Sequence, residues 1–94
     1  MALHHSAITV GTTPTLLTTV PGGVPYTQVS IFNADNSNVF LGDATVSTSG
    51  ANQGIQVVKN TVIQIWLEAN DQLYAISAAG TTANAVTVLY AAVF

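Results

Sequence analysis

The sequence predicts an all-β domain, on the basis of two features of its composition. Thirteen Thr, twelve Val and six Ile make the chain rich in β-branched residues, which lose rotamer freedom in helices and pack well on pleated sheets. Apolar residues also alternate with polar ones over short segments, and clusters of Gly, Pro, Asn and Asp separate these segments. About eight short strands joined by turns indicate a single small antiparallel β-sandwich, or a jelly-roll-like barrel, that spans residues 1–94.

The strands are expected in the intervals between turn-forming residues. We expect residues 1–6 to form a mobile N-terminal segment ahead of the first strand, and the Pro-Gly-Gly-Val-Pro stretch at 21–25 to connect two strands rather than two domains. Turn formers at 11–14, 21–25, 35–38, 49–54, 59–60, 70–71 and 79–82 separate the segments. In chain order the predicted strands cover residues 7–10, 16–20, 26–33, 38–41, 55–58, 62–67, 72–77 and 85–91.

Period-two alternation assigns the side chains of three predicted strands to faces. The set expected to face the core consists of Val29, Ile31, Ile63, Ile65, Leu67, Val86, Val88 and Tyr90. The opposite faces keep Phe32, Trp66 and Leu89, where a monomer would normally carry Lys, Glu or Thr. Together with Val93 and Phe94 in the apolar C-terminus, these three are the candidate interface residues. The alternative is that a bulge or a second layer buries them in the ordinary core.

Charged residues are scarce. Asp, Glu, Lys and Arg make up 5% of the chain, where an ordinary soluble domain has about 25%. A folded monomer of this mass should expose roughly 5,100 Å², so each charge would serve about 1,000 Å². The chain has no Cys for disulfides, which leaves oligomerisation as the common way to stabilise so small a core.

Composition also argues against several classes of partner. The net charge is −3 and Lys59 is the only cation, whereas nucleic-acid binding needs several Lys or Arg in one patch. No apolar run approaches the roughly 20 residues of a membrane-spanning helix. The first residues lack the basic start and apolar stretch of a signal peptide, so we expect synthesis in a cytoplasm.

Residues that could support catalysis or metal binding are few. Adjacent strand residues such as His4 and His5 point to opposite faces, and without Cys or a third His they do not predict a zinc site. Ser6, His5 and Asp43 could be grouped as a triad on paper, but no nucleophile motif supports it. We therefore expect no catalytic residues, no cofactor and no enzymatic activity.

The acidic residues are predicted to be structural or solubilising. The run Asp35-Asn36-Ser37-Asn38 offers oxygen ligands but lacks the central Gly and later Glu of a calcium loop. It is better explained as a polar turn in which Asx side chains cap backbone groups. All four acids lie at or next to predicted turns or strand ends and are interpreted as solubilising: Asp35, Asp43, Glu68 and Asp71.

An aromatic sugar-binding platform is a further possibility. Trp66 and Tyr74, with Tyr26 as a third aromatic, could stack on sugar rings while Gln64 and Gln72 bond hydroxyl groups. Core or subunit packing is the competing explanation for these aromatics. A glycan-binding module is therefore one function that the sequence allows.

The chain contains a series of short segments in a fixed order: 29–33, 39–42, 49–50, 54–55, 73–77, 80–82 and 86–89. This order, which covers about residues 6 to 91, resembles the small head decoration, cement or minor capsid proteins of tailed bacteriophages. A receptor-binding or glycan-binding module associated with the fibre or tail of the same kind of particle is the alternative function. The resemblance implies a small β-sandwich that assembles as a homo-oligomer, often a trimer, on the capsid surface of the virion and bridges units of the major capsid protein. Many such proteins have Arg or Lys where this chain has Thr27 and Gln28, so its contacts with the shell would be apolar and hydrogen-bonded.

Overall fold

The computed structural model describes residues 2–23 and 25–92, and it confirms the prediction of an all-β sandwich. Eight strands form two four-stranded antiparallel sheets. The total accessible surface is 5118 Å², close to the area expected for a monomer of this mass. The strands are β1 (Ala2–Ile8), β2 (Thr15–Thr19), β3 (Tyr26–Asn33), β4 (Val39–Gly42), β5 (Ile55–Val57), β6 (Thr61–Glu68), β7 (Gln72–Ile76) and β8 (Val86–Ala92).

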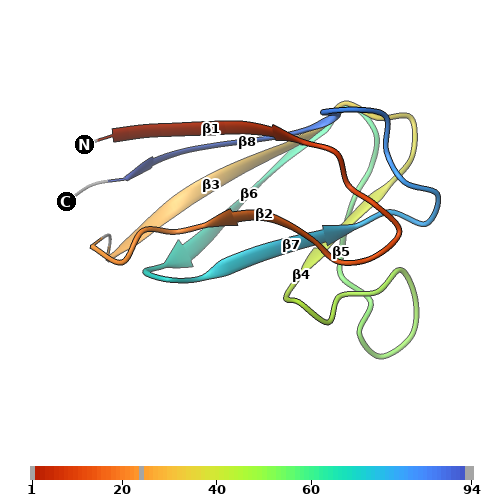
Figure 1. Ribbon diagram of the computed structural model, residues 1–94, viewed down its shortest axis with the longest axis horizontal. Coiled ribbons are helices and arrows are strands. Elements are labelled where there is room, and N and C mark those ends of the chain that lie inside the picture. The colour runs from red at the N-terminus through yellow and green to blue at the C-terminus, as the bar shows by residue number, and fades with distance from the viewer. Residues whose placement is uncertain (1, 24, 93–94) are drawn as a thin grey trace.

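Each strand in the first half of the chain pairs with a strand in the second half. The first sheet has the order β1-β8-β3-β6 and the second has the order β2-β7-β4-β5 (Figure 1). The first strand therefore pairs with the last, β2 with β7, β3 with β6 and β4 with β5. Apart from the β4–β5 connection, each connection leads from one sheet to the other, so residues far apart in the sequence are neighbours in space.

The core lies between the two sheets and is built from the alternating residues predicted to face inward. On β3, Val29 and Ile31 are fully buried, and on β8 the same holds for Val86 and Val88. On the edge strand β6, the inward residues are only partly buried against this core. The second sheet contributes Leu17, Val39, Leu41, Val57, Leu73 and Ala75.

The ends of β6 are set by two Asn residues. Asn60 (φ 59°) precedes the strand and Asn70 (φ 67°) follows it closely, and Asn tolerates this left-handed backbone region better than most residues. At the far end the side chain of Asp71 accepts a hydrogen bond from the Glu68 amide at 2.8 Å. These turns hold β6 to eight residues.

A buried amide connects the two sheets. Asn33, at the end of β3, has no accessible surface. Its Nδ2 donates to the carbonyl oxygens of Ser37 (2.9 Å) and Val57 (3.0 Å), the latter on β5 of the second sheet. Its Oδ1 accepts from the amide of Asp35 at 3.0 Å. Every polar atom of this side chain is thus paired, which is what makes its burial tolerable.

The N-terminal residues differ from the prediction. We expected residues 1–6 to form a mobile segment and the first strand to begin at Ala7. Instead, the described residues from Ala2 onward lie in β1 and pair in register with β8, from Ala2 opposite Ala92 to Ile8 opposite Val86. The reason is long-range: β8 presents a complete strand edge, which is not visible from the local sequence.

Candidate interaction surface

The first sheet turns one face away from the core, and this face is the candidate functional site. Alternate residues of all four strands lie on it, because successive side chains of a strand point to opposite faces. Its large apolar members are exposed by 38% to 69%. We call this set the apolar face; its large apolar members are Leu3, Tyr26, Phe32, Val62, Trp66 and Leu89.

Strand register brings these side chains together across the sheet. Phe32 on β3 lies opposite Val62 on β6 and Thr87 on β8. Leu89 on β8 lies opposite His5 on β1 and Ser30 on β3. Phe32 and Val62 are therefore direct cross-strand neighbours, whereas Leu89 lies between two polar side chains. Six large exposed apolar side chains on one face of a sheet are still more than the scattered single exposures of an ordinary surface, and they indicate an interaction site.

An aromatic pair lies at one end of the apolar face. The rings of Tyr26 and Trp66 meet edge to face, with centroids 5.4 Å apart and planes at 63°. Both residues remain more than 60% exposed. Gln28 lies directly opposite Trp66 in the β3–β6 register. The pair thus presents a large, stiff apolar surface with an amide beside it.

The polar groups on the apolar face are nearly all uncharged. Among the described strands of the first sheet, Glu68 at the end of β6 is the only Asp, Glu, Lys or Arg. Gln64 donates a hydrogen bond from Nε2 to Oγ of Ser30 at 3.3 Å. A partner on this face would therefore be held by apolar burial and hydrogen bonds rather than by ion pairs.

The structure describes three of the five candidate interface residues. Phe32, Trp66 and Leu89 are all exposed on the apolar face, so the alternative that they belong to the ordinary core is wrong. Val93 and Phe94 lie outside the described residues. The sequence interpretation missed Leu3 and His5 because it left residues 1–6 out of the sheet.

The predicted pairing of Trp66 with Tyr74 is wrong. Trp66 lies on the apolar face of the first sheet, whereas Tyr74 lies on β7 of the second sheet, opposite Leu16 and Gly42. Tyr26 is the aromatic neighbour of Trp66 instead. Tyr74 lies close to Trp66 in the sequence, which suggested that the two rings are neighbours. The chain crosses to the other sheet between β6 and β7, however, and this separates them.

The histidines do not converge with other ligands. His4 stacks on Tyr90, with ring centroids 5.1 Å apart and planes at 11°, while His5 is exposed on the apolar face. Asp43, the third member of the triad drawn on paper, follows β4 in the second sheet, where it accepts from the amide (2.9 Å) and hydroxyl (2.6 Å) of Thr45. No group of three His, Cys, Asp or Glu that could hold a metal ion occurs within residues 2–23 and 25–92.

Asp35 has a structural role inside the β3–β4 turn. Oδ2 accepts hydrogen bonds from the amide and the hydroxyl of Ser37, and Oδ1 accepts from the amide and the hydroxyl of Thr82, both at 2.9 Å. The predicted Asx-capped turn is confirmed. The interpretation of Asp35 as a solubilising residue is wrong, because only 7% of it is exposed and both carboxylate oxygens are occupied by the protein itself.

These bonds make the stability of the protein depend on pH. The Ser37 hydroxyl, followed by the Thr82 amide, holds the pKa of Asp35 well below its usual value. A carboxyl whose pKa is lower in the folded than in the unfolded state stabilises the fold above the unfolded pKa of about 3.9 and loses that effect as the pH falls. Asp35→Asn should therefore lower stability at pH 7 and flatten its decline below about pH 4.

Urea unfolding at several pH values between 7 and 2 measures this effect. Asn36→Ala, at an exposed position of the same turn, removes no titratable group, so it is the control and should keep the wild-type pH dependence. If Asp35→Asn shows the same decline as the wild type, the Asp35 contacts do not stabilise the fold in the way described.

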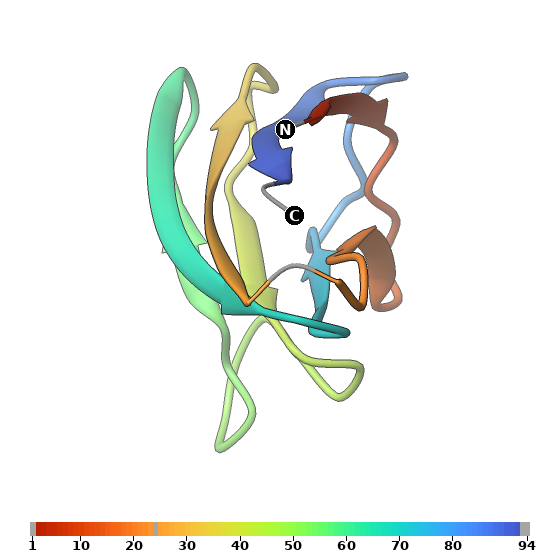
Figure 2. The same ribbon diagram turned by 90° about the vertical axis from the view of Figure 1, so that its left-hand side faces the viewer.

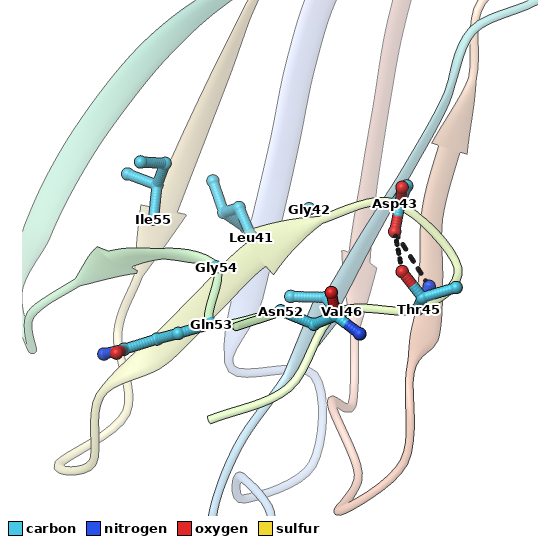
Figure 3. A pocket seen from close by; sticks show the side chains of 9 residues that line it. All are labelled: Leu41, Gly42, Asp43, Thr45, Val46, Asn52, Gln53, Gly54 and Ile55. Atoms are coloured by element: carbon cyan, nitrogen blue, oxygen red, sulfur yellow. Dashed lines mark hydrogen bonds between the residues drawn. The ribbon is translucent and has the colours of Figure 1, made fainter. Parts of the chain in front are cut away.

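The cavity of about 250 Å³ on the second sheet is shallow and lies beside the β4–β5 connection (Figure 3). Its only titratable side chain is Asp43, which is already bonded to Thr45. It is smaller than the clefts that usually hold small ligands. Its lining residues are Leu41, Gly42, Asp43, Thr45, Val46, Asn52, Gln53, Gly54 and Ile55.

The floor of this cavity is tightly packed at Gly54. A Cβ atom at this position would overlap the carbonyl oxygen of Leu41 and lie 2.6 Å from Cγ2 of Val46. Gly54→Ala should therefore force the β4 backbone or Val46 to move and lower the free energy of unfolding by about 1 to 3 kcal/mol. Gly11→Ala, where the nearest atom is 3.7 Å away, is the matched control for thermal unfolding; equal stability of the two variants would contradict this packing.

Comparisons with known proteins add no family. No protein-family model matches the chain, and neither a search of curated proteins nor one of solved structures returns a match. Within the described residues there is no helix long and apolar enough to cross a membrane.

Proposed function

We propose that the protein is a non-catalytic structural component of a bacteriophage virion, which decorates or cements the capsid as a homo-oligomer. Its partners would be further copies of itself and the major capsid protein, and its place would be the outer surface of the shell. The proposal extends the resemblance in segment order described above. The observation that supports it best is the apolar face, with its six large exposed apolar side chains and its single charge at Glu68 among the described residues.

The composition of the apolar face suits a permanent part of a particle. A protein that cements a capsid must remain bound at every salt concentration that the particle encounters. Salt screens surface ion pairs far more than it weakens apolar burial. A free monomer gains nothing from six large exposed apolar residues on one sheet, whereas an assembled one buries them. The low charge of the chain is thereby explained by coverage of the surface.

Fold connectivity gives a second, weaker support. We interpret the pairing of β1 with β8, β2 with β7, β3 with β6 and β4 with β5 as the ribbon pattern of a jelly roll. Jelly rolls occur in viral capsid and lectin domains, among others. Because one fold hosts many functions, the jelly-roll pattern alone does not indicate a capsid role.

Binding to capsid shells tests the proposal. Purified protein is mixed with shells that lack it, and bound copies are counted after sedimentation. We expect saturable binding that raises the thermal stability of the shell and that changes little between about 0.1 and 1 M salt. Absence of binding, or binding lost at high salt, would contradict a cement held by apolar contacts.

A glycan-binding module is a second candidate, which the exposed Tyr26–Trp66 pair with Gln28 beside it favours. Aromatic faces hold sugar rings, and an amide can bond their hydroxyl groups. A glycan array separates this role from the first. Specific binding that Trp66→Ala removes would favour a receptor-binding role, while a blank array favours the cement.

A further inference from the structure

We infer that the corner of the apolar face formed by Tyr26, Trp66 and Glu68 binds the guanidinium group of an Arg side chain from a different protein. The inference rests on the proposed function, because it gives the chemistry of one contact that the covering partner makes. It differs from sugar binding by the same aromatic pair, since the charge of Glu68 rather than the amide of Gln28 selects the ligand.

The three side chains lie at one end of the first sheet. Tyr26 begins β3 and Glu68 ends β6, and the two residues lie opposite each other in the antiparallel register. Trp66 precedes Glu68 by two residues, so both side chains point to the same face of β6. Figure 2 shows the start of β3 beside the end of β6. Two aromatic rings and a carboxylate therefore share this corner.

The two rings offer their faces to a cation. Their planes meet at 63° with the centroids 5.4 Å apart, so they form two walls of a corner rather than a flat stack. Tyr26 is 61% exposed and Trp66 is 63% exposed, which leaves most of both rings open to a partner. The face of an aromatic ring carries partial negative charge and attracts a cation that lies over it, most strongly at Trp.

The charged side chains around this corner are acidic. Glu68 is exposed, and Asp71 in the following turn is held beside it, because Oδ2 of Asp71 accepts a hydrogen bond from the Glu68 amide at 2.8 Å. Lys59, the only Lys or Arg of the chain, precedes the other end of β6. That strand is about 23 Å long at 3.3 Å per residue. The corner therefore attracts a cation, and no Lys or Arg of the chain itself lies near it.

A guanidinium group fits this combination better than an ammonium group does. It is planar, so it can stack on the Trp66 ring while its N–H groups donate to both oxygens of the Glu68 carboxylate. It is also more weakly hydrated than an ammonium ion, which makes its transfer to an apolar face less costly. Arg is enriched at protein interfaces together with Tyr and Trp. These properties indicate Arg rather than Lys as the partner side chain.

The sequence shows that the partner is not a second copy of this chain. Its one basic residue other than His is Lys59, and it has no Arg. In the proposed role, the major capsid protein supplies the Arg side chain. Glu68 is the single exception to the uncharged character of the apolar face, and one exposed ion pair contributes little to a contact. The weak salt dependence expected for shell binding is therefore retained.

Nuclear magnetic resonance tests the site with a small probe. Trp66 is the only Trp of the chain, so the signal of its indole N–H reports on this corner alone. N-acetylarginine amide should shift this signal saturably at millimolar concentrations. The corresponding citrulline compound has nearly the same shape without the charge, and it should bind at least about fivefold more weakly. Equal binding of the two compounds, or no shift up to the solubility limit, would overturn the inference.

Two substitutions separate a guanidinium site from a sugar site. Glu68→Gln removes the charge at nearly constant shape, so it should weaken binding of the arginine compound to the level of the citrulline compound. Gln28→Ala, directly opposite Trp66, is the matched control and should change this binding by less than about twofold. A loss of binding in Gln28→Ala with no loss in Glu68→Gln would contradict selection by charge.

Choline distinguishes a free small cation from an Arg side chain. It carries a positive charge but has no N–H groups to donate to a carboxylate, so it should bind at least about fivefold more weakly than the arginine compound. Tighter binding of choline, or of a methyl glycoside, would replace the guanidinium with another ligand and overturn the inference.

Shell binding shows whether this inference and the proposed function stand together. We expect Glu68→Gln to lower the affinity for capsid shells by about fivefold. If shells bind but the arginine compound does not, the capsid role stands and the guanidinium site is overturned. If the arginine compound binds but shells do not, the site stands without the capsid role. Binding of the arginine compound with unchanged shell affinity of Glu68→Gln would contradict the capsid protein as the source of the Arg side chain.

Discussion

Asn33→Ala is expected to lower the free energy of unfolding by about 3 to 5 kcal/mol, because a buried group left without its hydrogen-bond partner costs about 1 to 3 kcal/mol. The substitution removes three hydrogen bonds at once, to Ser37, Val57 and Asp35. A domain of this size has a total stability of only about 5 to 14 kcal/mol. Urea unfolding followed by circular dichroism measures the loss.

Asn36→Ala is the control for this prediction. Asn36 lies three residues further along the chain, in the same turn, and is exposed, so its replacement should change stability by less than about 0.5 kcal/mol. A loss below about 1 kcal/mol for Asn33→Ala would mean that the amide does not hold the two sheets together.

Leu89→Lys is expected to weaken binding to capsid shells by at least about thirtyfold, because a truncation or charge at the centre of a buried contact costs about 2 kcal/mol or more. Leu89 is 46% exposed and lies between His5 and Ser30 on the apolar face. Cosedimentation of the variant with shells measures this effect.

The other sheet provides the matched substitution. Leu16 on β2 is 43% exposed, and Leu16→Lys should leave shell binding unchanged. Both variants should remain folded, with stability changes of about 1 kcal/mol or less, since surface substitutions rarely cost more. Equal binding by the two variants would show that the apolar face does not touch the shell.

Much of the fold could be predicted because its signals are local. Turn residues such as Asn60 and Asn70 and the alternation along β3, β6 and β8 place eight strands in the correct order. The same alternation correctly assigns Phe32, Trp66 and Leu89 to the face opposite the core. Successive residues of a strand point to opposite faces of the sheet. Identifying the residues that face the core therefore also identifies those that face away from it.

Long-range contacts explain what could not be predicted. Residues 2–6 join the sheet because β8 pairs with them, more than eighty positions away in the sequence. Asn33 ends a predicted strand and Asp35 begins a predicted turn, and the burial of both depends on contacts with Val57 and Thr82. The Tyr26–Trp66 contact depends on the β3–β6 register. None of these partners lies within the local segment.

The structure shows where the five charged residues lie. Asp35 is buried in a turn, and Asp43 and Asp71 accept hydrogen bonds within two other turns. Lys59 lies in the turn before β6, and Glu68 ends that strand. Glu68 is therefore the only charged residue on the described strands of the first sheet, whereas the surface of a free monomer normally carries many more charges. Under the proposed function, coverage of the apolar face in the assembled particle would explain the low charge of the chain.

Electron cryomicroscopy of capsid shells saturated with the protein tests directly whether the apolar face is covered in the particle. We expect density for the sandwich on the outer lattice of the shell, with the face that bears Phe32, Trp66 and Leu89 packed against the shell or neighbouring copies. Copies confined to the neck or tail, or copies on the shell with this face open to solvent, would contradict it.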